Sequence, residues 1–344
     1  MSRPTAIVTG ASTGIGFCTA RALARRGYLV VVATRDSISG EAAARRINAD
    51  ASSYASSLAE GEVAGGEAIF MKLDVSSLAS VTAFASTAIA QWGSSLHCLV
   101  LNAGIASRAS GESRMTSDGF ERIFATNFLG HFHLAQSLLD ILKFNAIASP
   151  PGGAGTPVRI VTLGSVTHRL VRAAPSWPAV IEGRGPRGSQ YALSKLAAVA
   201  FAFELQRRLV GTGVSAIAVN PGGVASDIWR HVKGYTRCVL RPLMACAFLT
   251  TEQGSRTSVM AGALKIVDSA GNEVDASAPM PLYLSPYAAP KWAQTGGYVA
   301  LLFDLLGPFG GPRVLAPSSL SLDPAVGAAL FDACEGAVGR AKGM

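Results

Sequence analysis

The sequence has 344 residues, a formal net charge of +8 and 49% hydrophobic residues, a composition that excludes a disordered chain. No apolar run reaches the roughly 18–20 residues that would span a bilayer, and the nearest candidate, 298–309, is short and contains Asp304. Basic residues occur in small scattered groups without interleaved aromatic residues, which argues against nucleic-acid binding. The five cysteines show no C-x-x-C spacing, and the first 30 residues lack a secretory signal pattern. We therefore expect reduced thiols in a cytoplasmic protein.

Apolar runs of strand length alternate with longer segments of helical periodicity. The strand-like runs are 5–8, 28–34, 68–73, 98–101, 159–163 and 214–219. The helix-like segments are 17–26, 81–92, 120–144 and 191–209. Near-continuous apolar strands separated by helices are typical of a parallel sheet covered on both faces. We predict an α/β fold with a doubly wound parallel sheet of about seven strands.

The pattern predicts one domain over residues 1–265 and a C-terminal extension, 266–344, packed on the same domain. Residues 320–338 are expected to form the last helix of that extension. Three stretches are rich in small residues or in Gly and Pro and are interpreted as insertions. They are residues 49–66, 148–157 and 268–319.

A glycine-rich loop follows the first strand directly and precedes a helix. Its spacing is G-x-x-x-G-x-G, with Gly10, Gly14 and Gly16 as the glycines. Glycines let the backbone approach a pyrophosphate, and the N-terminus of the following helix offers free N–H groups and a positive dipole. The strand–loop–helix context favours a dinucleotide site over a simple tight turn. The residues expected to bind there are Gly10, Ser12, Thr13, Gly14, Ile15 and Gly16.

The end of the second strand bears on the choice of nucleotide. Asp36 lies 20 residues after Gly16, where an acid that binds the ribose would favour NAD. Asp36 is also well placed to cap the helix that starts near Ser39, and Arg35 could bind a 2′-phosphate. We favour NADP(H), with NAD(H) left open. Asp74 and Val75, after the third strand, are expected near the adenine.

Tyr191 and Lys195 are one helical turn apart at the start of a strongly apolar helix, so both project from one face. A phenol titrates near pH 10 and is a poor acid or base at neutral pH. A nearby ammonium group, with an oxidised nicotinamide, would stabilise the phenolate and lower its pKa. The tyrosine could then donate a proton to a carbonyl oxygen or accept one from a hydroxyl. Alone, this spacing is equally typical of an ordinary helix surface.

Further polar residues are expected at the carboxyl edge of the sheet, where ligands bind in doubly wound folds. Ser165 follows the fifth strand, Asn102-Ala103-Gly104 the fourth and Asn220-Pro221-Gly222 the sixth. Asn127 lies on a long predicted helix.

This ordered set of motifs resembles the short-chain dehydrogenase/reductases, over about Thr5 to Ala263. The stretches N-F-L-G-H-F (127–132), R-I-V-T-L-G-S-V-T-H (159–168) and T-T-E-Q-G (250–254) are similar to the retinol dehydrogenase and protochlorophyllide reductase branch. The gap of 26 residues between Ser165 and Tyr191 also suits that branch. The resemblance implies a Rossmann-type fold in which residues 1–265 form the NAD(P)-binding catalytic domain.

The resemblance also implies roles for single residues. Tyr191 is the acid or base, Lys195 lowers its pKa and holds the nicotinamide ribose, Ser165 hydrogen-bonds the substrate oxygen, and Asn127 anchors a water that relays protons. The further cofactor contacts implied are Arg35, Asp74, Val75, Asn102, Ala103, Gly104, Pro221, Gly222, Val224 and Ser226, the last at the carboxamide. The sequence departs from the branch at Gly164, where a second serine is frequent, and at Thr13, where many NADP-using members carry a basic residue.

Three other features have competing interpretations. His131 and His133 form H-x-H but face different sides of a helix, so we expect no metal site. His168 is expected to line the site entrance or to lie on the surface. Residues 227–249 are apolar and occupy the family's substrate loop, which suits a lipophilic ligand, core packing or a dimer surface. With 298–309 they could also contact a membrane surface.

Together these features predict an NADP(H)-dependent oxidoreductase that interconverts a carbonyl and an alcohol, with a lipophilic substrate of retinoid, steroid or fatty-aldehyde type. A carbon–carbon double-bond reductase is one alternative, although the cysteine expected after the Pro-Gly turn is here Gly223. A non-catalytic NADP(H)-binding sensor is the other. Peripheral membrane attachment and a homo-oligomer remain open.

Overall fold

The computed structural model describes most of the chain with side chains. The described residues are 3–57, 65–148, 156–185, 189–225, 248–264, 266, 274, 282–287 and 309–343. Within them no helix is both long enough and apolar enough to cross a bilayer.

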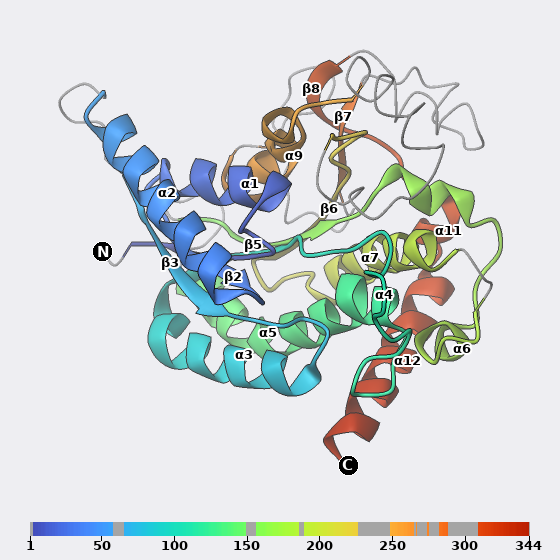
Figure 1. Ribbon diagram of the computed structural model, residues 1–344. Coiled ribbons are helices and arrows are strands. Elements are labelled where there is room, and N and C mark those ends of the chain that lie inside the picture. The colour runs from blue at the N-terminus through green and yellow to red at the C-terminus, as the bar shows by residue number, and fades with distance from the viewer. Residues whose placement is uncertain are drawn as a thin grey trace.

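One eight-stranded sheet forms the centre of the molecule (Figure 1). The strands are β1 (Thr5–Thr9), β2 (Leu29–Thr34), β3 (Glu67–Lys72), β4 (Leu96–Leu101), β5 (Val158–Leu163), β6 (Val214–Val219), β7 (Leu282–Tyr287) and β8 (Phe309–Val314). Their spatial order is β3-β2-β1-β4-β5-β6-β7-β8. All neighbours pair in parallel except β7 and β8, which are antiparallel. The order reverses between β1 and β4, the position where doubly wound sheets bind ligands.

The six strands predicted from apolar runs are confirmed to within two residues at each end. The strands β7 and β8 were not predicted, because they lie within the stretch 268–319 that was interpreted as an insertion. Pro286 interrupts the apolar run of β7, and the structure accommodates it at a shift of register between Ser285 and Tyr287. Proline is confined to bulges and edge strands because it cannot donate to the ladder, and β8, which contains Pro312, is the edge.

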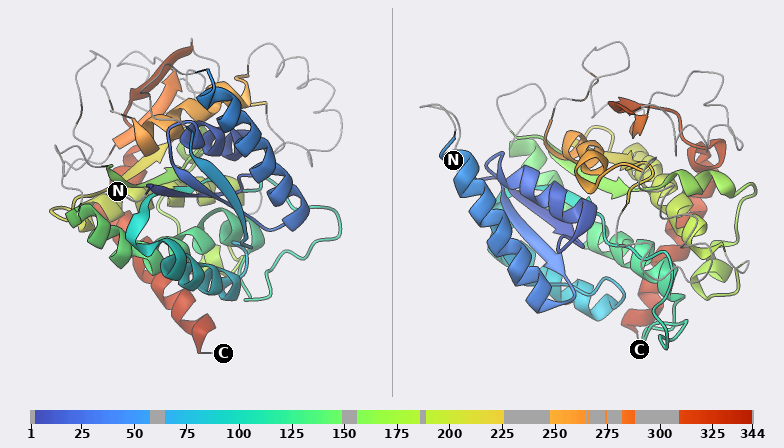
Figure 2. Two further views of the ribbon diagram at one scale, coloured as in Figure 1. Left: turned by 90° about the vertical axis from the view of Figure 1, so that its left-hand side faces the viewer. Right: turned by 45° about the horizontal axis from the view of Figure 1, so that its top comes forward.

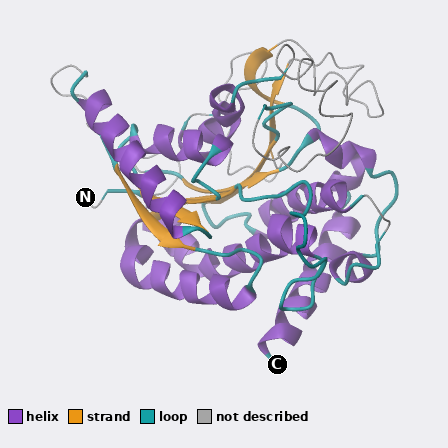
Figure 3. Ribbon diagram, viewed as in Figure 1, coloured by secondary structure: helices purple, strands orange, loops and turns teal. Residues whose placement is uncertain are grey.

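Helices cover both faces of the sheet (Figure 2; Figure 3). One face carries α1 (Gly14–Ala24), α2 (Ser37–Ala55) and α9 (Thr251–Ala263), and the other α3 (Leu78–Trp92), α5 (Gly130–Ala148), α7 (Gln190–Arg208) and α12 (Pro324–Lys342). The shorter helices are α4 (Arg122–Phe124), α6 (Trp177–Ile181) and α11 (Ser319–Leu322). Side chains of β1 alternate between the faces: Ile7 joins the α3–α5–α7 core, whereas Ala6 and Val8 join the α1–α2 core. Both cores are built mainly from apolar side chains, as the continuous strands predict.

Helix ends differ from the prediction at three places. Residues 49–55 finish α2 and are no insertion. The expected helix over 120–144 is broken by the π-helical turn Ala125–Leu129. The expected last helix, 320–338, is divided: Asp323 caps α12 through a bond from Ala325 N–H, and Pro324 occupies the first turn. The predicted cap of α2 is confirmed, because the Asp36 carboxylate accepts a hydrogen bond from Ser39 N–H at 2.8 Å.

The C-terminal helix α12 closes the face formed by α5 and α7. Phe331 is fully buried; its ring centroid lies 5.2 Å from that of Phe132 and 5.3 Å from that of Phe201. The Arg208 guanidinium lies 4.0 Å from the same Phe331 centroid and covers the cluster. Aromatic clusters of this kind contribute more than their buried area alone.

Three histidines are buried in the described part of the fold, His131, His133 and His168, and burial lowers the pKa of each. His131 and His168 are almost wholly buried, at 2% and 0% exposure. Burial lowers the pKa of His131 to about 4 and that of His168 to about 3, although each also hydrogen-bonds a backbone carbonyl, which opposes the shift. Both side chains are therefore neutral in the folded protein at neutral pH.

We predict that the free energy of unfolding falls as the pH falls from about 6.5 towards about 4. The unfolded chain takes up protons on these histidines below their ordinary pKa of 6.5, whereas the folded protein does not until about pH 4. Urea unfolding at a series of pH values measures the slope. His131→Asn, which removes one titrating group, should show a shallower fall; an unchanged slope would contradict the assignment.

Candidate active site

The glycine loop lies between β1 and α1 at the carboxyl edge of the sheet. Gly10 and Gly14 have φ of 65° and 61°, the left-handed region that glycine adopts without strain. A β-carbon on Gly16 would come within 2.4 Å of Asn102 Nδ2 and 2.5 Å of Gly10 O. A β-carbon on Gly14 would meet nothing within 4 Å, so the loop opens towards solvent there. The N-cap residue Thr13 makes no side-chain capping bond, so this helix end fits a phosphate group.

Thr9 joins this loop to the end of β4. Its buried hydroxyl oxygen accepts hydrogen bonds from the backbone N–H groups of Asn102, at 2.8 Å, and Ala103, at 2.9 Å. The Asn102 amide in turn donates to Thr9 O at 2.7 Å and to Gly10 O at 3.3 Å. The two strand ends at the reversal of strand order are therefore fixed to each other. The predicted group Asn102-Ala103-Gly104 lies beside the glycine loop.

Arg35 and Asp36 follow β2 at the same edge. Both are exposed, but the Asp36 carboxylate is occupied by the helix cap, and that hydrogen bond lowers its pKa. After β3, Asp74 Oδ1 accepts hydrogen bonds from the N–H and hydroxyl of Ser76 at 2.9 and 2.6 Å. Val75 is buried against the start of α5, since a β-carbon on Gly130 would come within 1.8 Å of Val75 O.

Ser165, Tyr191 and Lys195 are brought together at the end of β5. Ser165 is the N-cap of the 3₁₀ turn Val166–Leu170, and its side chain hydrogen-bonds that of Tyr191 near the start of α7. One turn further, Lys195 Nζ donates to Leu163 O at 2.9 Å and lies 5.7 Å from the centroid of the Tyr191 ring. The structure therefore brings these three side chains close together.

The ionisation of this group differs from the expectation. Burial raises the pKa of Tyr191 to about 12, and the hydrogen bond with Ser165 opposes the shift. Burial lowers the pKa of Lys195 to about 8. The protein's own groups thus keep Tyr191 protonated at neutral pH, and the expected lowering by Lys195 is not among the causes. A protonated phenol is the form that can donate a proton.

Asn127 lies in the π-helical turn that breaks the predicted long helix. Its Oδ1 accepts from Ile105 N–H at 2.7 Å, and its Nδ2 donates to Ile105 O at 3.0 Å and to Ser194 Oγ at 3.0 Å. Ser194 Oγ donates to Tyr191 O at 2.7 Å. Asn127 therefore connects the loop after β4 to the helix that carries Tyr191. Single π turns are frequent at functional sites.

The sequence after β6 is described only in part. Asn220 N–H donates to Leu284 O at 2.7 Å, and Gly222, with φ of 83°, donates its N–H to Asn220 Oδ1 at 3.1 Å. Val224 is buried and pairs with Leu249. Ser226 and all but the last two residues of the predicted substrate segment, 227–249, lie outside the described residues.

Two histidines have partners that the sequence did not indicate. His131 Nδ1 lies 3.1 Å from Asn127 O, and its Nε2 lies 2.9 Å from Thr9 Oγ1. His168 was expected at the site entrance or on the surface, and this expectation is wrong. The side chain is wholly buried, with Nδ1 2.6 Å from Ser165 O. The neighbouring catalytic motifs were the only sequence signal for either. No three His, Cys, Asp or Glu side chains gather to hold a metal ion in the part of the chain that the structure describes.

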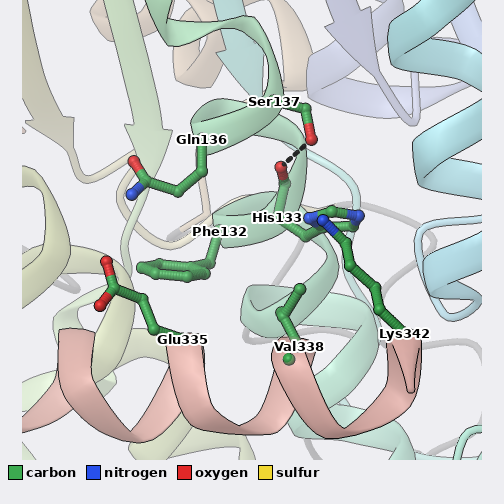
Figure 4. A pocket seen from close by; sticks show the side chains of 8 residues that line it. Phe132, His133, Gln136, Ser137, Glu335, Val338 and Lys342 are labelled. Atoms are coloured by element: carbon green, nitrogen blue, oxygen red, sulfur yellow. Dashed lines mark hydrogen bonds between the residues drawn. The ribbon is translucent and has the colours of Figure 1, made fainter. Parts of the chain in front are cut away.

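A hollow of about 340 Å³ lies elsewhere, between α5 and α12 (Figure 4). It is lined by Phe132, His133, Gln136, Ser137, Glu335, Val338, Gly339 and Lys342. None of the predicted site residues lines it.

Comparisons with known proteins agree with this geometry. A family model described as short chain dehydrogenase matches residues 4–177. Retinol dehydrogenase 12 of Mus musculus is 39% identical over 253 residues, covering 74% of this chain and 71% of the relative. Polyprenol dehydrogenase of Mus musculus is 38% identical over 270 residues, covering 77% and 73%.

Solved structures share the fold. An uncharacterised protein from Mycobacterium paratuberculosis superposes with a TM-score of 0.64 at 27% identity, covering 98% of this chain and 94% of that one. The RhlG–NADP complex of Pseudomonas aeruginosa superposes with a TM-score of 0.57 at 24% identity, covering 81% and 94%. The chain therefore belongs to the short-chain dehydrogenase family, is similar to retinol dehydrogenases within it, and is an oxidoreductase that acts on CH–OH and C=O groups with NAD(P)(H).

Proposed function

We propose that this protein is an NADP(H)-dependent reductase of carbonyl groups in lipophilic molecules, and the reverse alcohol dehydrogenase, with Tyr191 as its acid. One observation carries the proposal: Ser165, Tyr191 and Lys195 come together at the end of β5, at the same carboxyl edge of the sheet as the open glycine loop that follows β1. Residues from two separate segments, the turn after β5 and helix α7, meet there, as catalysis by orientation requires.

The bound dinucleotide would supply the hydride, and the protein's groups handle the oxygen and its proton. The Ser165 hydroxyl holds the carbonyl oxygen, and Tyr191, which keeps its proton with a pKa raised by burial to about 12, donates that proton to the oxygen. After the reaction, Tyr191 must regain a proton. We assign this proton route to Lys195 and Asn127, because Asn127 bonds Ser194, the residue before Lys195 in α7. In the oxidative direction the same phenol must lose its proton first, so reduction suits these residues better.

The choice of NADP(H) rests on the different environments of the Arg35 and Asp36 side chains. The Asp36 carboxylate is engaged by Ser39 N–H at 2.8 Å, which leaves it poorly placed to bind ribose hydroxyls. Arg35 is exposed at the end of β2 with its guanidinium accessible to a 2′-phosphate. The glycine loop, Asp74 and Val75, Asn102-Ala103-Gly104 and Pro221-Gly222 with Val224 complete the proposed dinucleotide site.

A lipophilic substrate is supported by the names of the relatives, which are dehydrogenases of retinol and polyprenol, and by the apolar sequence 227–249. The same apolar character leads us to propose peripheral contact of a cytoplasmic protein with a membrane surface.

Tyr191→Phe should lower kcat for reduction of retinal or medium-chain aldehydes by roughly a hundredfold or more, the usual contribution of a positioned acid. NADPH affinity should be unchanged, because the ring and its packing remain. Steady-state kinetics and fluorescence titration with NADPH measure the two quantities. Tyr54→Phe, at a partly exposed tyrosine of α2, is the matched control. Turnover that survives in the Tyr191 variant would overturn the proposal, and NADPH binding by wild type without turnover of any carbonyl would favour a sensor.

Arg35→Ala should weaken NADPH binding by about tenfold, the effect of losing one charge-assisted hydrogen bond at an exposed site. NADH binding should change by less than about twofold, since NADH has no 2′-phosphate for this residue to bind. Arg45→Ala, an exposed arginine one turn along α2 from Glu41, controls for loss of surface charge. An equal loss for both nucleotides would contradict the assigned role of Arg35.

A further inference from the structure

His168 connects the loop of Ser165 to the C-terminal extension. Its Nδ1 lies 2.6 Å from Ser165 O, and its Nε2 lies 3.1 Å from the backbone nitrogen of Ser318. A backbone N–H can only donate, so Nε2 accepts and Nδ1 carries the proton that goes to the Ser165 carbonyl. The two partners therefore determine one neutral tautomer of a wholly buried ring.

Two neighbouring side chains reach the same extension. Arg169 Nη2 donates to Ala316 O at 2.7 Å, and Trp177 Nε1 donates to Val326 O at 3.2 Å. The His168 ring packs edge to face against the Tyr283 ring of β7, with the two centroids 5.5 Å apart. Residues 165–177 thus depend on the C-terminal segment for three side-chain hydrogen bonds to its backbone.

Besides these bonds, the turn packs on α7, and Val166 within it is buried. Within the turn, His168 N–H donates to Ser165 O at 3.1 Å and Val171 N–H to His168 O at 3.3 Å. Ser165 itself is extended, with φ of −166° and ψ of 153°. A displacement of the turn that carries the Ser165 backbone would break the bond from Nδ1 to Ser165 O and would move the serine hydroxyl with it. Catalytic groups must be held to within about 0.5 Å of their productive geometry.

We propose that residues 316–318 position Ser165 for catalysis through His168, which acts as a positioning residue. The inference rests on the proposed function, since Ser165 is there the partner of the substrate oxygen. It gives the C-terminal extension a part in the reaction, because the Ser318 N–H fixes the tautomer of His168 that holds the serine loop.

Ser318→Pro tests the link by removing the single N–H that His168 accepts. The φ of Ser318 is −67°, the value that proline adopts. The proline Cδ takes the place of the hydrogen on the backbone nitrogen, which lies 3.1 Å from Nε2, so the variant removes the bond and also displaces the His168 ring. We expect kcat for carbonyl reduction to fall by about two- to tenfold, the equivalent of one neutral hydrogen bond. The KM for NADPH should not change, because the nucleotide site lies on other elements.

Two matched variants separate the N–H from other effects. Ser318→Ala removes the hydroxyl, which bonds Ser321 Oγ at 3.2 Å, but keeps the N–H. Ser319→Pro places a proline at the first position of α11, where a helix tolerates it and its N–H has no partner within the helix. Both should keep the wild-type kcat. An equal fall in either of them would show that the proline or the hydroxyl, and not the bond to His168, is responsible.

The kcat of a double variant distinguishes a positioning role of His168 from a merely structural one. His168→Asn places an amide where Nδ1 lies, so it still donates to Ser165 O but offers no acceptor to Ser318. If the two residues act through one bond, His168→Asn with Ser318→Pro should have the same kcat as either single variant. If the loss of kcat in the double variant equals the product of the two single losses, the proposal is overturned.

Amide hydrogen exchange keeps the test independent of the substrate. Ser318→Pro should speed exchange at His168 N–H and Val171 N–H, the two amides bonded within the serine turn, and Ser319→Pro should not. If wild type reduces no carbonyl, the proposed function fails while faster exchange still supports the mechanical link. Unchanged exchange with normal wild-type turnover would overturn the link and leave the proposed function standing.

Discussion

The hydroxyl group of Thr9 holds together the parts of the molecule on which the site depends. It lies at the end of β1, fully buried, where it accepts hydrogen bonds from Asn102 and Ala103 N–H. His131 Nε2 lies 2.9 Å from the same oxygen, and His131 Nδ1 faces Asn127 O. A parallel sheet leaves its strand ends without ladder partners at the point where the strand order reverses. Here one side chain satisfies those ends and connects the glycine loop, β4 and α5.

Burial dominates the ionisation of the site. The same dry environment raises the pKa of Tyr191 and lowers that of Lys195, in each case favouring the neutral form. In such surroundings a hydrogen bond to the phenol counts for more than it would in water. Under the proposed mechanism, the Ser165 contact would therefore serve proton transfer as well as binding of the substrate oxygen, and its geometry would need support from outside the turn.

Much of the fold could be predicted because the apolar strands and the spacing of Gly10, Gly14 and Gly16 are local signals. Tyr191 and Lys195 could also be predicted to share a helix face. Features that depend on distant partners could not. The π turn at Asn127 is stabilised by bonds to Ile105, 22 residues away, and His168 meets Ser318, 150 residues away. The departure at Gly164 has a similar origin, since a β-carbon there would come within 2.8 Å of Val199 Cγ2. β7 was missed because a proline bulge interrupts its pattern.

The packing of α12 has a consequence for how the polypeptide must be handled. Phe331 packs against both Phe132 of α5 and Phe201 of α7, whose own ring centroids lie 5.6 Å apart. Helix α12 begins immediately after Asp323, which is exposed. Protease cleavage at that junction would leave Ser165, Tyr191 and Lys195 chemically intact but would release the helix and expose an apolar aromatic face. The truncated protein would self-associate or bind detergent. Loss of α12 would therefore be observed as aggregation before any loss of activity could be measured.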